Sequence, residues 1–175
     1  MRRTGNRDFQ QTVVSVMNNT NQFPSIVVRH AVVEGVKSGL YTDITKMKNL
    51  AAATQDPELY SSTVYALGLL KTSEAVKAIT SVYGRYSNAD VGNASLKNNE
   101  TTILNMLNSD QTNDILAGIT ATQLIKLHPA VEKLQLIEVN SKNEIIRNKA
   151  HDAIVEIEAT PKSNFPSNSY KWEDR

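Results

Sequence analysis

The clearest pattern of apolar positions lies near the C-terminal end of the chain. Five apolar residues recur there at i, i+4, i+7, i+8 and i+11, which is the spacing of one face of an α-helix. They are Ile146, Ala150, Ala153, Ile154 and Ile157. Arg147, Lys149, Asp152 and Glu156 lie at positions between them, and Asn143 stands where a helix N-cap is expected. The pattern predicts an amphipathic helix of about four turns.

A second strong pattern lies between residues 57 and 70. Asp56 is a good N-cap, and Pro57 stands at the first helical position, where proline is favoured. Tyr60, Val64 and Leu67 share one face of the predicted helix. We therefore expect a helix that begins at Pro57 and buries this face.

Further amphipathic stretches predict six more helices with short connections. They span residues 24–38, 42–53, 73–86, 99–108, 111–127 and 129–139. The first of these is rich in β-branched residues, such as Ile26, Val27 and Val28, and would also suit a strand. A helix is favoured because the valines do not alternate strictly and because a lone strand would have no partner. Residues 1–23 are interpreted as an N-terminal capping helix or arm.

Matching residues recur at a spacing of about one helix pair. Gly35 and Gly68 lie thirty-three residues apart at similar places in their helices, and Asp110 and Asn143, which are expected to start two later helices, have the same spacing. A fixed period carried by helix, turn and helix is typical of an α-helical solenoid.

A longer recurrence indicates that one unit is shortened. Leu70-Lys71 and Ile125-Lys126 each precede an Ala-Val pair by the same interval, and they lie fifty-five residues apart. This is one full period plus about twenty-two residues. A shortened, degenerate pair between Ala89 and Asn108 accounts for the difference, and Gly92 with the Asn-rich stretch 93–99 is expected to break it.

These motifs resemble HEAT repeats of the bacterial lyase-like kind. Asp56-Pro57, Ala66-Leu67-Gly68 and Glu74-Ala75-Val76 are similar to the first helix, the turn and the start of the second helix of such a repeat. A second match to the first helix is formed by Asn143, Arg147, Ala150 and Ile154. The resemblance covers residues 24–159 and implies an all-α, right-handed α-α superhelix of the HEAT/ARM-like solenoid class, with about four to five helix pairs.

Composition narrows the classes of function. The 175 residues suit one domain, and a formal net charge of +1 provides no global attraction to nucleic acid or to an anionic membrane. The chain contains no cysteine, which excludes disulfides and thiolate chemistry. No apolar run is long enough to span a bilayer, and the first twenty residues do not form a signal peptide. A cytoplasmic location is expected; a periplasmic one fits if a signal sequence has been removed.

Candidate catalytic chemistry is sparse. The histidines, His30, His128 and His151, are interpreted as structural or surface residues and not as metal ligands. HEAT-like hydroxylases carry His-Glu pairs, which do not occur here, and HEAT-like DNA glycosylases need a strongly basic concave surface. We predict no enzyme activity, no cofactor and no metal site. The alternative is a HEAT-like enzyme or enzyme subunit of the bilin-lyase or DNA-repair kind.

The favoured hypothesis is a scaffold for a protein or peptide partner. In HEAT-like stacks the second helix of each pair lines the concave side, so polar residues beside its apolar stripe face a partner. The predicted contact residues are Lys46, Asn49, Lys77, Ser81, Arg85 and Lys133. The alternative interpretation is that these residues form an ordinary solvated face.

The ends of the chain leave further alternatives open. Residues 160–175 are predicted to be an irregular tail, whose Phe165, Tyr170 and Trp172 either cover the last repeat or form an exposed motif. If the chain is instead a piece of a longer solenoid, we expect an apolar end surface at one terminus.

Overall fold

The computed structural model describes residues 7–86 and 89–160, and it is all-helical over these ranges. It contains no strand there, so the predicted all-α class is confirmed. Residues 24–38, which also suited a strand, form a helix. The α-helices are α1 Arg7–Asn18, α2 Ser25–Lys37, α3 Ile44–Ala53, α4 Pro57–Leu69, α5 Ser73–Val82, α6 Ala89–Lys97, α7 Glu100–Met106, α8 Thr112–Ile125, α9 Val131–Asn140 and α10 Glu144–Glu158. Two 3₁₀ turns, η1 Thr20–Gln22 and η2 His128–Ala130, complete the set.

Helix starts follow the local chemistry that the sequence predicted. The Asp56 carboxylate accepts hydrogen bonds from the backbone N–H groups of Glu58 and Leu59 at the start of α4. The Asn143 side chain accepts from the first turn of α10 in the same way. Both predicted N-caps are therefore confirmed. Asp110, which was expected to start a helix, lies one residue before Gln111, the N-cap of α8.

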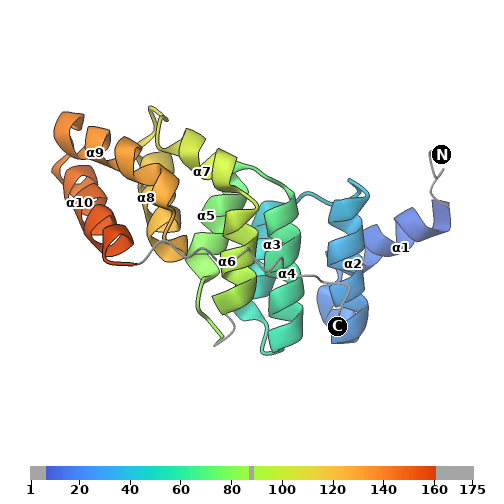
Figure 1. Ribbon diagram of the computed structural model, residues 1–175. Coiled ribbons are helices and arrows are strands. Elements are labelled where there is room, and N and C mark those ends of the chain that lie inside the picture. The colour runs from blue at the N-terminus through green and yellow to red at the C-terminus, as the bar shows by residue number, and fades with distance from the viewer. Residues whose placement is uncertain (1–6, 87–88, 161–175) are drawn as a thin grey trace.

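The even-numbered helices form one continuous row along the molecule. Each of α2, α4, α6, α8 and α10 packs on the next, and Figure 1 shows the chain progressing from α1 at one end to α10 at the other. The first residues of these helices, 25, 57, 89, 112 and 144, are separated by 32, 32, 23 and 32 residues. The step of 23 residues, from α6 to α8, is shorter because it contains the short helices α6 and α7, which have 9 and 7 residues.

Two predicted details of this region are wrong. Gly92 and Asn93 lie within the regular helix α6 and do not interrupt it, whereas Asn98 and Asn99 lie in the turn before α7. The predicted helix 73–86 ends at Val82, and Gly84 follows with a φ of 72°. A left-handed φ takes the backbone out of the helical path at a residue where glycine has no steric penalty.

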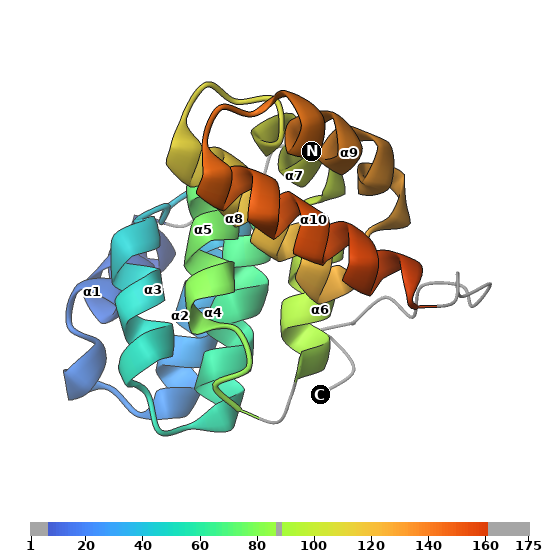
Figure 2. The same cartoon turned by 90° about the vertical axis from the view of Figure 1, so that its left-hand side faces the viewer.

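The odd-numbered helices form a second row that is interrupted. α3 packs on α5, and α5 packs on α7 and also on α8. α9 makes its extensive contacts with α10 and η2, beside it in the chain, and not with α7. Figure 2 shows α9 against α10 at one end of the molecule. The row of second helices is thus broken between α7 and α9.

The core is deepest at α4, which contacts neighbours on several sides. Nine of its 13 residues are buried, including Ser61, Ser62 and Thr63. Each of these hydroxyls donates to the backbone carbonyl four residues earlier, at 2.6 to 2.8 Å, so no hydroxyl in this group is left unsatisfied. Gly68 lets α6 approach closely, because a Cβ added there would lie 2.8 Å from Cβ of Ser95. Its counterpart Gly35 faces Val13 of α1 instead.

The fifty-five-residue recurrence corresponds to a repeated turn. Lys71, after α4, and Lys126, after α8, both have positive φ values, of 53° and 50°. The segment before each of these helices is also repeated. The hydroxyls of Thr54 and Ser109 accept from the backbone N–H two residues later, at Asp56 and Gln111. The hydroxyl hydrogen bond before the helix and the positive φ after it are therefore found at both α4 and α8.

Candidate functional site

The six residues predicted to contact a partner do not form one surface. Lys46 and Asn49 lie on α3 and Lys77 and Ser81 on α5, two helices that pack together. Arg85 is in the turn after α5, where it contacts α3, and Lys133 alone lies apart from these helices, on α9. The placement of Arg85 on a second helix was wrong, because α5 ends at Val82.

Lys77 is held in an ion pair between helices. Its ammonium nitrogen lies 2.7 Å from Asp114 Oδ1 of α8 and 3.6 Å from Glu74 Oε1. The hydrogen bond from Lys77 lowers the pKa of Asp114, and the same bond raises the pKa of Lys77. Ser109 Oγ donates to the second carboxylate oxygen at 3.3 Å. The ion pair of Lys77 therefore joins α5 to α8, and a partner that bound this ammonium group would have to compete with Asp114.

Two other predicted residues also make contacts within the chain. Arg85 donates from Nη1 to the carbonyl of Ala51 at 3.1 Å, and its guanidinium lies 5.8 Å from the centre of the Tyr86 ring. Lys46 donates to Oδ1 of Asn18 at 3.0 Å. These bonds join the turn after α5 to α3, and α3 to α1. Much of the predicted polar surface thus holds helices together.

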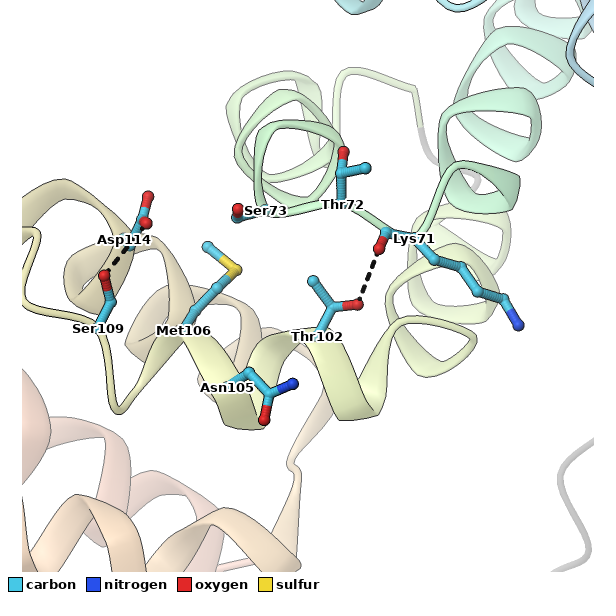
Figure 3. Close-up of a pocket in the computed structure, with 8 residues that line it drawn as sticks. All are labelled: Lys71, Thr72, Ser73, Thr102, Asn105, Met106, Ser109 and Asp114. Carbon is cyan, nitrogen blue, oxygen red and sulfur yellow. Dashed lines mark hydrogen bonds between the residues drawn. The ribbon is translucent and has the colours of Figure 1, made fainter. Parts of the chain in front are cut away.

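A polar groove of about 510 Å³ lies where α5, α7 and α8 meet (Figure 3). It is lined by Lys71, Thr72, Ser73, Thr102, Asn105, Met106, Ser109 and Asp114. Its polar groups bond largely to one another or to backbone: Thr102 Oγ1 donates to the Lys71 carbonyl at 3.2 Å, and Asp114 is bound by Ser109 and Lys77. The arrangement stabilises the junction of three helices.

A second groove, of about 500 Å³, lies between α9 and the start of α8, and we call it the α8–α9 groove. Its lining combines apolar side chains with polar ones: Asn108, Ser109, Asp110, Ile115, Lys133, Leu136, Ile137, Asn140, Ser141 and Ile146. The groove exists because α9 packs on α10 and leaves the side that faces α7 and α8 uncovered. Leu136 on this wall is 58% exposed.

Only Lys133, among the six predicted residues, lines the α8–α9 groove. It is half-buried, and Asp110, which also lines the groove, is exposed. The amide of Asn140 and the hydroxyls of Ser109 and Ser141 add hydrogen-bonding groups. The site offers an apolar surface with one cation, one anion and neutral polar groups around it.

The apolar wall of this groove was missed from the sequence. The helical spacing of Val131, Leu134 and Ile137 predicts that they form the buried stripe of this helix, but Leu134 alone is buried and the other two are half-buried. Leu136 and Val139 lie off that stripe, and Val139 is 78% exposed. Large apolar residues outside the predicted core face are the signal in the sequence that could have revealed this surface.

A third groove lies at the opposite end of the molecule, between α1 and α2. It measures about 270 Å³ and is almost entirely apolar, with Phe9, Val13, Val16, Val27 and Ala31 among its lining residues. We refer to it as the α1–α2 groove. It contains none of the predicted contact residues.

Membrane-spanning and metal-binding features are not found in the part of the chain that the structure describes. None of its helices combines the length and apolar character needed to cross a bilayer. Residues 7–86 and 89–160 bring together no group of three His, Cys, Asp or Glu side chains suited to a metal ion. The tail aromatics Phe165, Tyr170 and Trp172 lie outside the described residues.

Comparisons with known proteins find no matching family model, no significantly similar curated protein and no significantly similar solved structure. The fold and its grooves therefore define an all-helical protein, and its function is argued from the site alone.

Proposed function

We propose that this chain is a HEAT-like helical scaffold that holds a protein partner in the α8–α9 groove. The observation that carries the proposal is the break in the row of second helices, which leaves a groove of about 500 Å³ beside α9. The repeated 32-residue step of the even-numbered helices supports the HEAT-like resemblance, because each step adds one helix to the same row.

The chemistry of the groove suits a protein segment with apolar side chains. Protein interfaces typically combine an apolar centre with a polar rim, and helical segments dock in such grooves through apolar anchors. Leu136, Ile137 and Ile115 provide the apolar centre, whereas Lys133 and Asp110 provide opposite charges. A partner of this kind gains apolar burial at Leu136 and orientation from the two charges.

The proposal relocates the binding surface that the sequence suggested. Lys46, Lys77 and Arg85 already bond within the chain, so a partner on α3 and α5 would compete with those bonds. Lys133 remains a proposed contact residue, and Asn49 and Ser81 become secondary candidates. The proposed role is non-catalytic, with no cofactor, and the partner is a protein or peptide.

Site-specific photo-cross-linking in native cell extract tests the proposal. A photoreactive residue replaces Leu136, which lines the groove, or Gln135, which is exposed on the same helix but does not line it. A third variant carries the probe at Asn49 on α3. We expect a discrete adduct from position 136, none from 135, and loss of the adduct when Lys133→Glu is added.

The three positions separate the alternatives. Equal labelling from positions 135 and 136 would indicate non-specific contact and contradict the groove. A discrete adduct from position 49 alone would restore the surface of α3 and α5 as the binding site. Circular dichroism of each variant checks that it keeps the helical content of the wild type.

A further inference from the structure

Large exposed apolar side chains are confined to the two ends of the described structure. They lie on the first two and the last two helices, and α3 to α8 carry none. The residues are Phe9, Val14, Ile26, Val27, Leu136, Val139, Ile145 and Val155. Because exposed apolar surface marks interaction sites, we ask what binds at each end of the described structure.

The internal contacts of the even-numbered row show how one helix holds the next. Between α8 and α10, Gln123 and Lys126 both bond to Glu156. Since α10 starts 32 residues after α8, the α10 residues that correspond to Gln123 and Lys126 are Val155 and Glu158. Val155 is 54% exposed and Glu158 is exposed. These two positions are thus open on α10, with an apolar and an acidic side chain where α8 has an amide and a cation.

The other end of the row presents the complementary face. Glu58 of α4 pairs with Arg29 of the preceding helix α2. Since α4 starts 32 residues after α2, the α2 residue that corresponds to Glu58 is Ile26, which is 51% exposed. α1 crosses α2 but leaves the apolar α1–α2 groove, lined in part by Phe9 and Val27.

We propose that these faces bind each other in neighbouring copies of the chain, so that the outer face of α10 in one copy packs on the α1–α2 face of the next. This contact would place the helices of the next copy beyond α10, in the direction in which each even-numbered helix packs on its successor. An apolar side chain such as Val155 would then lie at the α1–α2 groove of the next copy.

Charge favours the same pairing. α10 carries four acidic residues and two basic ones, a net charge of −2. Helices α1 and α2 together carry three basic residues, Arg7, Arg29 and Lys37, and two acidic ones, Asp8 and Glu34, a net charge of +1. Oppositely charged ends attract each other in a head-to-tail arrangement, whereas two identical ends would repel.

The stacking is independent of the α8–α9 groove and differs from a symmetric dimer. The two faces are different, so the contact is heterologous and each added copy leaves a new open end. The average mass in solution should therefore rise with concentration and not stop at a dimer.

Sedimentation velocity of the full chain over a concentration series tests this, with two end variants. Phe9→Asp/Ile26→Asp alters the α1–α2 face, and Ile145→Asp/Val155→Asp alters the α10 face; all four side chains are exposed, so both variants should fold. We expect the wild type to form a concentration-dependent series. Each variant alone should be monomeric, and their equimolar mixture should form dimers, because one intact α10 face meets one intact α1–α2 face.

The control is Leu136→Asp, which alters the α8–α9 groove and should leave the stacking unchanged. Stacking by either end variant alone overturns the proposal, since it would indicate a symmetric contact, and so does a mixture that stays monomeric. A wild-type chain that is monomeric up to its solubility limit also overturns it, and assigns the ends to another occupant such as residues 161–175. Circular dichroism confirms that each variant is folded.

Discussion

Helices α4 and α9 have comparable shares of apolar residues but very different surroundings. In α4, nine of 13 residues are buried, and the helix contacts α2, α3, α5 and α6. In α9, one of 10 residues is buried, and the extensive contacts are with α10 and the adjoining η2 turn. The difference teaches that the number of neighbouring helices, and not the apolar content of a helix, determines its burial. The same apolar side chain stabilises the fold in α4 and remains available to a partner in α9.

The largest expected effect comes from truncating one leucine in each helix. Leu67 of α4 is fully buried, so Leu67→Ala should lower the free energy of unfolding by about 2–5 kcal/mol through lost burial and a cavity. Leu136→Ala in α9 should change it by less than about 0.5 kcal/mol. Urea denaturation of both variants measures the two values. A large loss for Leu136→Ala would mean that the exposed face of α9 is covered in solution.

The close approach of α4 and α6 gives the next largest effect. In Gly68→Ala the new Cβ would lie 2.8 Å from Cβ and 3.0 Å from Cα of Ser95. Relieving this clash requires the α6 backbone to move, so we expect a loss of about 1–3 kcal/mol by thermal or urea unfolding. The matched control is Gly118→Ala, where the nearest atom is the flexible Leu107 Cδ2 at 3.1 Å. Its loss should be smaller, and equal losses would contradict the backbone explanation.

Replacing two buried tyrosines by phenylalanine compares a hydroxyl group that donates a hydrogen bond with one that has no partner in the structure. Tyr60 of α4 donates to the carbonyl of Val82 at 2.8 Å, so Tyr60→Phe should cost about 1 kcal/mol. The hydroxyl oxygen of Tyr41, before α3, is buried without a hydrogen-bond partner. Tyr41→Phe should therefore leave the stability unchanged or raise it. Chemical denaturation of the two variants compares them directly, and a comparable loss in both would show that the Tyr41 hydroxyl is bonded in solution.

The smallest expected effect concerns the ion pair that joins α5 to α8, beside the break in the second row. The folded pKa of Asp114 is lowered by Lys77, so the pair contributes stability above the unfolded aspartate value of about 3.9 and loses it as the pH falls through the lowered pKa. Asp114→Asn should cost about 0.5–1 kcal/mol at pH 7. The difference from the wild type should shrink steadily as the pH is lowered below about 4.

Denaturation curves recorded from pH 7 down to strongly acidic conditions check this pH dependence. The control Asp152→Asn, exposed on α10, should change the stability by less than about 0.5 kcal/mol at pH 7. A loss for Asp114→Asn that stays constant with pH would show that packing, and not the charge pair, accounts for the effect.

Local interactions explain which parts of the fold were predictable. Asp56 and Asn143 cap helices through bonds to residues two and three positions later, so their roles follow from the adjacent sequence. The 32-residue step also follows from sequence recurrence, within one residue. The end of α5 was missed because residues 83–86 have no proline, and the turn depends on the positive φ of Gly84.

The candidate site was less predictable, because it depends on contacts between distant segments. Lys77 appeared to be a solvated lysine until α8 placed Asp114 beside it, 37 residues later. Ile137 appeared to be a core residue, but it lies on the wall of a groove because α7 does not reach α9. No local pattern determines whether a second helix has a neighbour on its open side.

The sequence by itself determined most of the helices and the repeated step of the even-numbered row, because capping and amphipathic periodicity act within a few residues. Only the tertiary structure decided which polar side chains form hydrogen bonds or ion pairs between helices, and which apolar side chains remain exposed. The physical reason is that burial and ion pairing depend on the elements that pack from outside the local segment. The break between α7 and α9 and the open faces at both ends are consequences of that packing.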